Sequence, residues 1–501
     1  MEKNYVLVVD EGTTGTRALL FDRKMNAVTQ AYREIPHLHP GPLAVEQDPK
    51  QIIDYTIEVM RECVEKAEIS PGEIEAVGIT YQRGTWLYWN KETGQALCRA
   101  IVWLDTRAQL AQEELLAMPG FRENFPYHTK MMQGGLVGNY AHATMLQVQK
   151  EHPDLVEALK EPTTVWGHID TWLIYNLTGK KSFFSDNSTA GNMHNPDKFD
   201  EYDLAVLPYV NMRPEMLAPY TPAVYDFGMM DKSVLGIEIP IRSCISDQQS
   251  ALFAQGCHEE GTAKCTLGTG AFLDLNTGDE IRFVDGLGPM IAWDIAGERK
   301  YLLEGMLQTA GSCLQWARDN LGFFENFKEL DEWAARVPDS GGVYFVPGIN
   351  GMDGPPYYST RGRASFMGIS ASATKEHFCR ALLESLGYMV ANLFIAIVGE
   401  GNLTRACVDG GASRGNITCQ TLADVTGATV IRPRMVEATA MGAAEMTAIA
   451  SGWYTVAETK DILASFGSDV FEPDLSNKEA VRERFEMWKL ACERSKDWIQ
   501  L

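Results

Sequence analysis

Three short glycine turns in the sequence contain the residue types that bind phosphate groups. The first, Asp10–Thr16, reads Asp-Glu-Gly-Thr-Thr-Gly-Thr, the second is Gly268-Thr269-Gly270, and the third is the pair Gly410-Gly411. Glycine lets the backbone approach a ligand closely, the exposed N–H groups of such a turn form an anion nest, and threonine hydroxyls add donors. A single turn of this kind is equally well an ordinary polar hairpin turn. Three of them in one chain favour a phosphate-binding protein.

Two aspartates are candidates for the chemistry of phosphoryl transfer. Asp10 adjoins the first turn and is a candidate Mg²⁺ ligand, because a hard cation held with phosphates usually takes one or two protein carboxylates and several waters. Asp247 follows an apolar run and begins a predicted helix. Transfer to an alcohol needs a carboxylate that accepts the hydroxyl proton, and Asp247 is our candidate for this base and for a second metal ligand. On position alone, a plain helix cap is the simpler interpretation of Asp247.

These turns must be positioned by the elements around them. β-rich runs at Tyr5–Val9 and Arg17–Phe21 flank the first turn, and runs at Thr262–Leu267 and Ala271–Leu275 flank the second. Each pair is typical of a β-hairpin, and two such hairpins in the two halves of the chain indicate a duplicated domain. Other segments alternate between helix and strand as in α/β domains. They are the helix Pro49–Lys66, the strands Ile74–Ile79, Ala100–Trp103 and Ile239–Ile245, the helix that begins at Asp247, the helix Lys375–Val398 and a helix that ends at Val425.

Length and charge limit the classes of function. A chain of 501 residues is too long for one ordinary core, so two domains of roughly 250 residues are expected. The formal net charge is -23, from 44 Lys+Arg against 67 Asp+Glu, and a field of this sign repels polyphosphate backbones. Nucleic acid is therefore not an expected partner. An anionic nucleotide would have to be held by local backbone donors and a metal.

The ten cysteines stand singly, without the close pairs of a zinc site or a redox motif. This spacing indicates reduced, buried thiols in a cytoplasmic protein. The N-terminus has no signal-peptide pattern. The apolar stretch Leu386–Val398 is too short to span a bilayer, so stable membrane insertion is not expected.

Taken together, the motifs resemble the FGGY family of carbohydrate kinases, and most of all its glycerol kinases. The resemblance follows the family's order over about residues 5 to 455. The matching text is Asp10-x-Gly-Thr-Thr-x-x-Arg17, Gly78-Ile-Thr-x-Gln-Arg83, Ala100-Ile-Val-Trp103, Asp170-Thr-Trp-Leu-Ile174, Asp247-Gln-Gln-x-Ala-Leu-Phe253, Gly268-Thr-Gly-x-Phe272, Leu303-Glu-Gly305, Gln315-Trp316, Val346-Pro347, Val408-Asp-Gly-Gly-Ala412 and Glu437-x-Thr-Ala-x-Gly-Ala443.

The resemblance implies an α/β fold of two actin-like (ribonuclease H-like) domains with an interdomain catalytic cleft. It assigns residues 1–255 to an N-terminal domain that mainly binds the acceptor and residues 256–455 to a C-terminal domain that mainly binds the nucleotide. Residues 456–501 would form a helical tail packed on the second domain. It further implies ATP and Mg²⁺ as cofactors and Asp247 as the base. The transferred phosphate would contact Thr13, Thr14 and Arg17; the nucleotide would contact Thr269, Gly311, Gln315, Gly411, Ala412 and Asn416; and the acceptor would contact Arg83, Trp103, Asp247, Gln248 and Phe272.

The acceptor pocket departs from the glycerol kinase pattern at Gly84. Glycerol kinases read Gln-Arg-Glu at this strand end and bind glycerol's hydroxyls through the glutamate, whereas this chain reads Gln82-Arg83-Gly84. A hydrogen bond to a charged group contributes about 1.5–3 kcal/mol, so its loss weakens glycerol use roughly 10- to 100-fold unless another group replaces it. The missing side chain also enlarges the pocket, which favours a polyol or ketose of about four to six carbons.

Two further departures concern the same pocket. The family's substrate-contacting tyrosine is expected within Gly134–Met145, yet Leu136 or Val137 stands there and the accompanying Lys-Trp is absent. The text Leu104-Asp-Thr-Arg107 resembles pentulose kinases more than glycerol kinases. Asp105 is therefore an additional candidate acceptor contact beside Gly84.

Our leading hypothesis is an ATP-dependent kinase for such a polyol or ketose. The runner-up is a glycerol kinase with a rearranged pocket. A non-catalytic, actin-like nucleotide sensor is a third hypothesis, which the retention of Asp10, Arg83 and Asp247 disfavours because a binder needs no base. The expected partners are the small-molecule acceptor and a second copy of the chain in a dimer or tetramer.

Overall fold

The computed structural model describes residues 2–499 except 134–139, 308, 350, 353–356, 358, 360, 400–401 and 436. The chain divides into two compact units. The first comprises Met1–Gly256, Met290–Tyr301 and Glu437–Ile462, and the second comprises Cys257–Pro289, Leu302–Val436 and Leu463–Leu501. Each unit therefore consists of three separate segments of the chain, whereas each domain expected from the sequence is one continuous segment.

The first unit is built on a six-stranded sheet in the order β13-β14-β5-β1-β2-β3. β1 (Tyr5–Glu11) lies near its middle, antiparallel to β2 (Gly15–Asp22) on one side and parallel to β5 (Ile74–Tyr81) on the other. Beyond β5 lies β14 (Ile239–Ser246), also parallel. The strands are fully buried at most positions, as expected for a sheet covered on both faces. The outer strands are β3 (Ala27–Glu34) and β13 (Val224–Met230).

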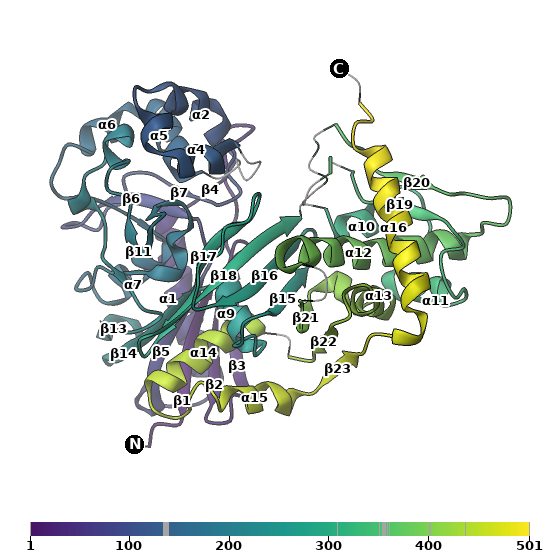
Figure 1. Ribbon diagram of the computed structural model, residues 1–501. Helices are drawn as coiled ribbons and strands as arrows, with labels where there is room; N and C mark the ends of the chain where they lie inside the picture. Colours follow the sequence, from purple (N-terminus) through teal and green to yellow (C-terminus); the bar gives the residue numbers. More distant parts are fainter. Residues whose placement is uncertain are drawn as a thin grey trace. The chain divides into compact units, whose positions relative to one another are not determined.

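Helices cover this sheet. α1 (Pro49–Lys66) begins where Asp48 caps the N–H groups of Lys50 and Gln51, with proline in its first turn, and packs on β2 and β3. α14 (Ala438–Ala450), from late in the chain, packs on β1, β5 and β14 (Figure 1). It is rich in alanine, which allows this close approach. α9 (Asp247–Ala254) follows β14 directly and packs on α14.

A smaller four-stranded sheet, in the order β4-β7-β6-β8, and a group of helices complete the first unit. Its strands are β4 (Glu46–Gln47), β7 (Ala100–Ile101), β6 (Trp86–Asn90) and β8 (Thr164–His168). The helices are α2 (Ala108–Ala117), α3 (Phe121–Asn124), α4 (Pro126–Gln133), α5 (Ala141–Glu151), α6 (Pro153–Ala158), α7 (Ile169–Leu177) and α8 (Lys232–Leu235). Short strands are β9 (Ser185–Asp186), β10 (His194–Asn195), β11 (Lys198–Tyr202) and β12 (Tyr220–Thr221).

A seven-stranded sheet in the order β17-β18-β16-β15-β21-β22-β23 lies mostly in the second unit, and only the residues of β17 and β18 within Met290–Tyr301 are assigned to the first unit. β15 (Thr262–Leu267) is antiparallel to β16 (Ala271–Gly278) and parallel to β21 (Arg405–Asp409), which is parallel to β22 (Thr429–Pro433). The hairpin of β17 (Gly288–Ile295) and β18 (Glu298–Leu307) and the edge strand β23 (Ser468–Phe471) complete it. The other elements of the second unit are α10 (Gly311–Asp319), α11 (Phe327–Ala334), β19 (Tyr344–Val346), β20 (Ser365–Met367), α12 (Lys375–Val398), α13 (Asn416–Thr426) and α16 (Lys478–Ser495). α15 (Thr459–Phe466) begins in the first unit and ends in the second.

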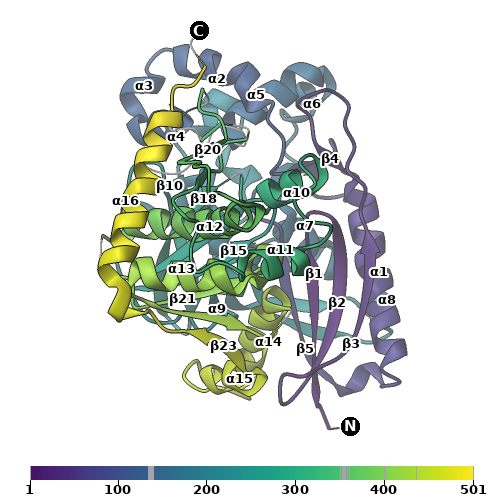
Figure 2. The same cartoon turned by 90° about the vertical axis from the view of Figure 1, so that its right-hand side faces the viewer.

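α12 is the core helix of the second unit. Among the described residues it is the one helix whose length and composition would suit a membrane span, but 78% of its apolar window is buried within the protein. It packs against α11, α13 and β19, and α16 lies alongside α12 and α13 (Figure 2). Phe485 and Trp488 of α16 join the same hydrophobic core. α12 is therefore a buried core helix, as the sequence predicted.

The two units repeat one topology. In each, a glycine-rich turn connects the two antiparallel strands of a hairpin, and the first of these strands also pairs in parallel with a later strand. In each, a further parallel strand lies beyond that one. The duplication predicted from the two hairpins is confirmed. The expected helix Pro49–Lys66 is found with the same bounds, whereas the predicted strand Ala100–Trp103 is shorter and ends at Ile101.

Candidate active site

Three candidate residues of the first unit lie at one edge of its sheet. β1, β5 and β14 are adjacent and parallel, and their last residues pair in register, Glu11 with Tyr81 and Tyr81 with Ser246. Asp10 lies at the end of β1, Arg83 follows β5, and Asp247 follows β14 directly. Ligands of open α/β sheets bind outside the carboxyl ends of parallel strands. The fold thus places a carboxylate, a guanidinium and a second carboxylate at this edge.

Asp10 belongs to an ion-pair triad. Nη2 of Arg17 lies 2.7 Å from Oδ2 of Asp10, and Nη1 of Arg17 lies 2.6 Å from Oε2 of Glu437. Burial raises the pKa of Asp10 to about 6; Arg17 opposes this shift, while the charges of Asp247 and Glu437 add to it. The two aspartates are therefore close enough to repel one another. This repulsion is what a bound divalent cation relieves, so the oxygen donors Asp10 and Asp247 fit Mg²⁺, which needs only one or two protein carboxylates.

The first glycine turn lines a cavity. Thr14 is exposed, and a cavity of about 640 Å³ is lined by Gly12, Thr14, Gly15, Arg17 and residues of β3, α1 and the loop at Glu437. Thr13 is half-buried, and its hydroxyl accepts a hydrogen bond of 2.8 Å from the indole N–H of Trp103. The phosphate-binding candidates Thr13, Thr14 and Arg17 are therefore neighbours on one hairpin, with the candidate acceptor residue Trp103 bonded to it.

Asp247 occupies the first turn of α9. Ser246 is the N-cap residue, and the backbone N–H of Gln248 donates to Oδ1 of Asp247 at 2.8 Å. Asp247 and Gln248 are both half-buried. The Asp247 carboxylate therefore lies near the positive end of the helix dipole.

Arg83 is oriented by a neighbour that sequence reasoning missed. Its Nη1 donates to Oε1 of Gln249 at 3.1 Å and also lies 3.0 Å from the sulfur of Met290. Gly84 follows with a φ of 80°, a left-handed conformation that glycine adopts without strain. A glutamate at this position would need either that strained conformation or a different path of the backbone.

The Asp105 carboxylate is buried and paired with an arginine. Its side chain is fully buried, Nη2 of Arg107 lies 2.7 Å from its Oδ2, and the backbone N–H of Val45 donates to the same oxygen at 3.0 Å. Arg107 also pairs with Glu46 at 2.8 Å and with Glu151 at 2.6 Å. These contacts engage the Asp105 carboxylate within the protein. Leu136 and Val137, the other residues of the altered pocket, lie outside the described residues.

The nucleotide candidates of the second unit gather at the carboxyl ends of β15 and β21. The backbone carbonyl of Gly268 accepts from Gly311 N at 3.0 Å, and that of Thr269 accepts from Ala310 N at 2.9 Å. A Cβ on Gly311 would lie 2.4 Å from the Gly268 oxygen and 3.4 Å from Cβ of Ala412. The second and third glycine turns and the start of α10 therefore meet in one place.

The remaining candidates lie near these turns. Gln315 is exposed on α10, and Gly411 is exposed directly after β21. Asn416 begins α13 and accepts a hydrogen bond of 2.8 Å from Arg432. Thr269 is exposed as well, whereas Phe272 lies half-buried in β16, paired with Thr266 of β15.

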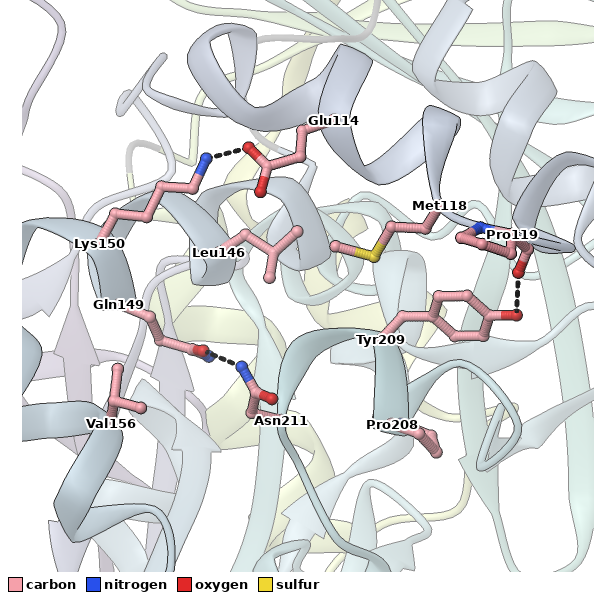
Figure 3. A pocket seen from close by; sticks show the side chains of 10 residues that line it. All are labelled: Glu114, Met118, Pro119, Leu146, Gln149, Lys150, Val156, Pro208, Tyr209 and Asn211. Atoms are coloured by element: carbon pink, nitrogen blue, oxygen red, sulfur yellow. Dashed lines mark hydrogen bonds and ion pairs between the residues drawn. The ribbon is translucent and has the colours of Figure 1, made fainter.

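A separate cavity of about 550 Å³ lies among the helices of the first unit (Figure 3). Its lining includes an ion pair of Glu114 with Lys150 and a hydrogen bond between the amides of Gln149 and Asn211. None of the candidate residues lines it. It is distinct from the sheet edge that carries Asp10 and Asp247.

Both halves of the chain match models of one protein family. Residues 5–254 match the N-terminal domain, and residues 263–451 the C-terminal domain, of the FGGY family of carbohydrate kinases. The chain is 37% identical to a protein named glycerol kinase 2 from Thermotoga maritima over 508 residues, and 36% identical to one named glycerol kinase from Thermoanaerobacter pseudethanolicus over 510 residues. Each alignment covers 99% of both proteins.

Solved structures show the same fold. The glycerol kinase of Plasmodium falciparum with ADP superposes with a TM-score of 0.90 at 27% identity, covering 100% of this chain and 99% of that one. A xylulose kinase from Lactobacillus acidophilus superposes with a TM-score of 0.81 at 17% identity, covering 98% of both chains. The fold is the two-domain, actin-like fold expected from the sequence. The chain belongs to the FGGY family of carbohydrate kinases and is a phosphotransferase that acts on alcohol groups.

Proposed function

We propose that this enzyme transfers the γ-phosphoryl group of ATP to one hydroxyl of a small polyol or ketose of about four to six carbons. The observation that carries the proposal is the grouping of Asp10, Arg83 and Asp247 at the carboxyl edge of three adjacent parallel strands. This grouping combines an oxygen donor for a cation, a donor for hydroxyl groups and a base, which are the parts that phosphoryl transfer to an alcohol requires.

In this mechanism Asp247 accepts the proton of the reacting hydroxyl. Arg83 and Gln248 hydrogen-bond the acceptor, and Trp103 and Phe272 supply apolar surface that orients its carbon chain. Thr13, Thr14 and Arg17 hold the transferred phosphoryl group. Thr269, Gly311, Gln315, Gly411, Ala412 and Asn416 hold the nucleotide. Asp10 and Asp247 are the proposed Mg²⁺ ligands, and the cation, when bound, neutralises charge that develops on the phosphates.

The length of the acceptor is proposed from Gly84. Gly84 leaves no side chain at the position where glycerol kinases have their glutamate, and the Asp105 carboxylate is paired with Arg107. A pocket without the glutamate loses part of its affinity for glycerol and gains room for a longer acceptor.

The second candidate acceptor is glycerol itself. It is favoured by the full-length relatives at 36–37% identity that are named glycerol kinase. Phosphorylation of glycerol would then rely on Arg83, Gln248 and Asp247 without the glutamate. The non-catalytic sensor is disfavoured, since Asp247 stands half-exposed in the first turn of α9 where a base is needed.

We further propose that the enzyme is cytoplasmic. Nine of the ten cysteines are buried, and the tenth, Cys98, is half-buried. The partners that we propose are the acceptor, MgATP and further copies of the same chain.

The experiment is an ADP-release assay with Mg²⁺ and ATP across a panel of glycerol, tetritols, pentitols, hexitols, ketoses and aldoses. The proposal predicts the highest kcat/KM for an acceptor longer than glycerol. Efficient turnover of glycerol alone would select the second candidate, and no turnover of any alcohol would overturn both.

A further inference from the structure

A closed ring of hydrogen bonds joins the phosphate turn to the acceptor wall in the first unit. Gln47 Nε2 donates to the carbonyl of Thr13 at 2.8 Å, and Gln82 Nε2 donates to Oε1 of Gln47 at 2.8 Å. The hydroxyl of Thr85 donates to Oε1 of Gln82 at 3.1 Å and accepts from the backbone N–H of Trp103 at 3.3 Å. Trp103 closes the ring through its indole N–H, which donates to the hydroxyl of Thr13 at 2.8 Å.

Three residues of this ring are fully buried, and the other two are half-buried. Gln47, Gln82 and Thr85 have no exposed surface, whereas Thr13 and Trp103 are half-buried. The backbone N–H of Gln82 also donates to the carbonyl of Glu11 at 2.7 Å, which ties the end of β5 to the end of β1. Buried polar groups that are fully bonded specify one arrangement, because each unpaired group would incur its desolvation cost.

We propose that Gln47, Gln82 and Thr85 are positioning residues that couple the phosphate turn to the acceptor pocket. The inference rests on the proposed function, in which Thr13 contacts the transferred phosphoryl group and Trp103 contacts the acceptor. Because one ring holds both, a displacement of the Trp103 indole moves the Thr13 hydroxyl. Occupation of the acceptor pocket therefore aligns the phosphate turn, and an empty pocket leaves it less well aligned for transfer to water.

Thr85 offers the sharpest test, because Thr85→Val keeps the shape of the side chain and removes the hydroxyl, while Thr85→Ser keeps the hydroxyl. We expect Thr85→Val to lower kcat roughly 10-fold and to raise KM for both substrates, since small misplacements of reacting groups have large effects on rate. We also expect more ADP released per molecule of phosphorylated acceptor. Thr85→Ser should stay within about 3-fold of the wild type in all of these quantities.

The glutamines provide a second, independent measurement. Gln47→Met, Gln82→Met and their double variant should lose similar activity, because either substitution opens the same ring and the effects of residues in one network do not add. Gln51→Met is the matched control: Gln51 lies on α1 and bonds Tyr55 outside the ring, so its kinetics should be unchanged.

The outcomes separate the inference from the proposed function. If the wild type phosphorylates no polyol or ketose, the proposed function fails. The inference is overturned if the wild type is active but Thr85→Val does not differ from Thr85→Ser in its kinetic constants or in its ratio of ADP to phosphorylated product. Loss of melting temperature alone, with normal kcat, KM and coupling ratio, would likewise show the ring to be merely structural.

Discussion

Arg83 donates a hydrogen bond of 3.1 Å to the side chain of Gln249, which is itself fully buried. Gln249 is held by the carbonyl of Ser188 at 2.9 Å and by the hydroxyl of Ser246 at 2.5 Å. Ser246 is the residue immediately before Asp247. One amide therefore connects the guanidinium proposed to bind the acceptor with the start of the helix that carries the proposed base.

Replacement of Gln249 by methionine should impair acceptor binding specifically. The Arg83 guanidinium would lose the amide oxygen that orients it. We therefore expect KM for the alcohol substrate to rise roughly 10-fold, the equivalent of about 1.4 kcal/mol, with KM for ATP little changed. Steady-state kinetics with each substrate varied in turn measures both. Gln112→Met, on α2 and bonded to the Met132 carbonyl, is the matched control. Equal increases in both KM values would contradict the assignment.

Substitutions at two glycines of the second unit distinguish an effect on packing from an effect on nucleotide binding. Gly311→Ala places a Cβ 2.4 Å from the Gly268 carbonyl oxygen, so we expect a loss of about 1–3 kcal/mol in stability together with weaker ATP binding. Gly411→Ala meets no atom within 4 Å. It should keep the wild-type melting temperature and raise KM for ATP, because its methyl group occupies the proposed nucleotide surface. Thermal melts and ATP titrations test the pair, and a Gly411→Ala variant that binds ATP normally would place the nucleotide elsewhere.

Glu11 should make stability depend on pH. It is fully buried, and burial raises the pKa of its carboxyl to about 8 from its ordinary value of 4.5. Between pH 4.5 and 8 the folded protein keeps a proton that the unfolded chain releases, so this residue's contribution to stability falls as pH rises through that window. Glu11→Gln should therefore melt like the wild type at pH 4.5. At pH 9 it should melt at a higher temperature than the wild type, because its free energy of unfolding is larger by about a few kcal/mol. A difference that does not vary with pH would refute the raised pKa.

Gly84→Glu tests the origin of acceptor specificity. The substitution restores the carboxylate of the glycerol kinase pattern but introduces a side chain where φ is 80°, at a cost of about 1–2 kcal/mol. We expect kcat/KM for glycerol to rise relative to that for longer acceptors by roughly 10-fold. Gly84→Ala controls for backbone strain alone. If both variants change all acceptors equally, the position does not select the substrate.

Much of the fold was readable from local sequence. The glycine turns, the strands around them and the capped helix Pro49–Lys66 follow from residue types that act over a few positions. The edge strand Ser468–Phe471 was missed within a tail that the sequence predicted to be helical, because its pairing with β22 is a tertiary contact.

The site was only partly readable for the same reason. Asp105 resembled an acceptor contact by its motif, but Arg107 and the distant Glu46 and Glu151 draw it into a buried network. Gln47 gave no local signal, and Gln249 lies within the matched Asp247–Phe253 motif but was assigned no role, since their partners lie far away along the chain. Residues that hold other residues in place are defined by the fold rather than by a motif.

The most direct test of the account is the reaction of the Asp247→Asn variant beside the wild type, followed by ³¹P NMR with MgATP and the best acceptor of the panel. The account predicts that the wild type forms ADP and one phosphorylated acceptor in equal amounts. It predicts that Asp247→Asn forms them roughly 10²- to 10⁴-fold more slowly while binding ATP normally in a titration. A variant that retains most of its rate would show that the proton is taken by another group, and a wild type that forms no phosphorylated alcohol would contradict the account as a whole.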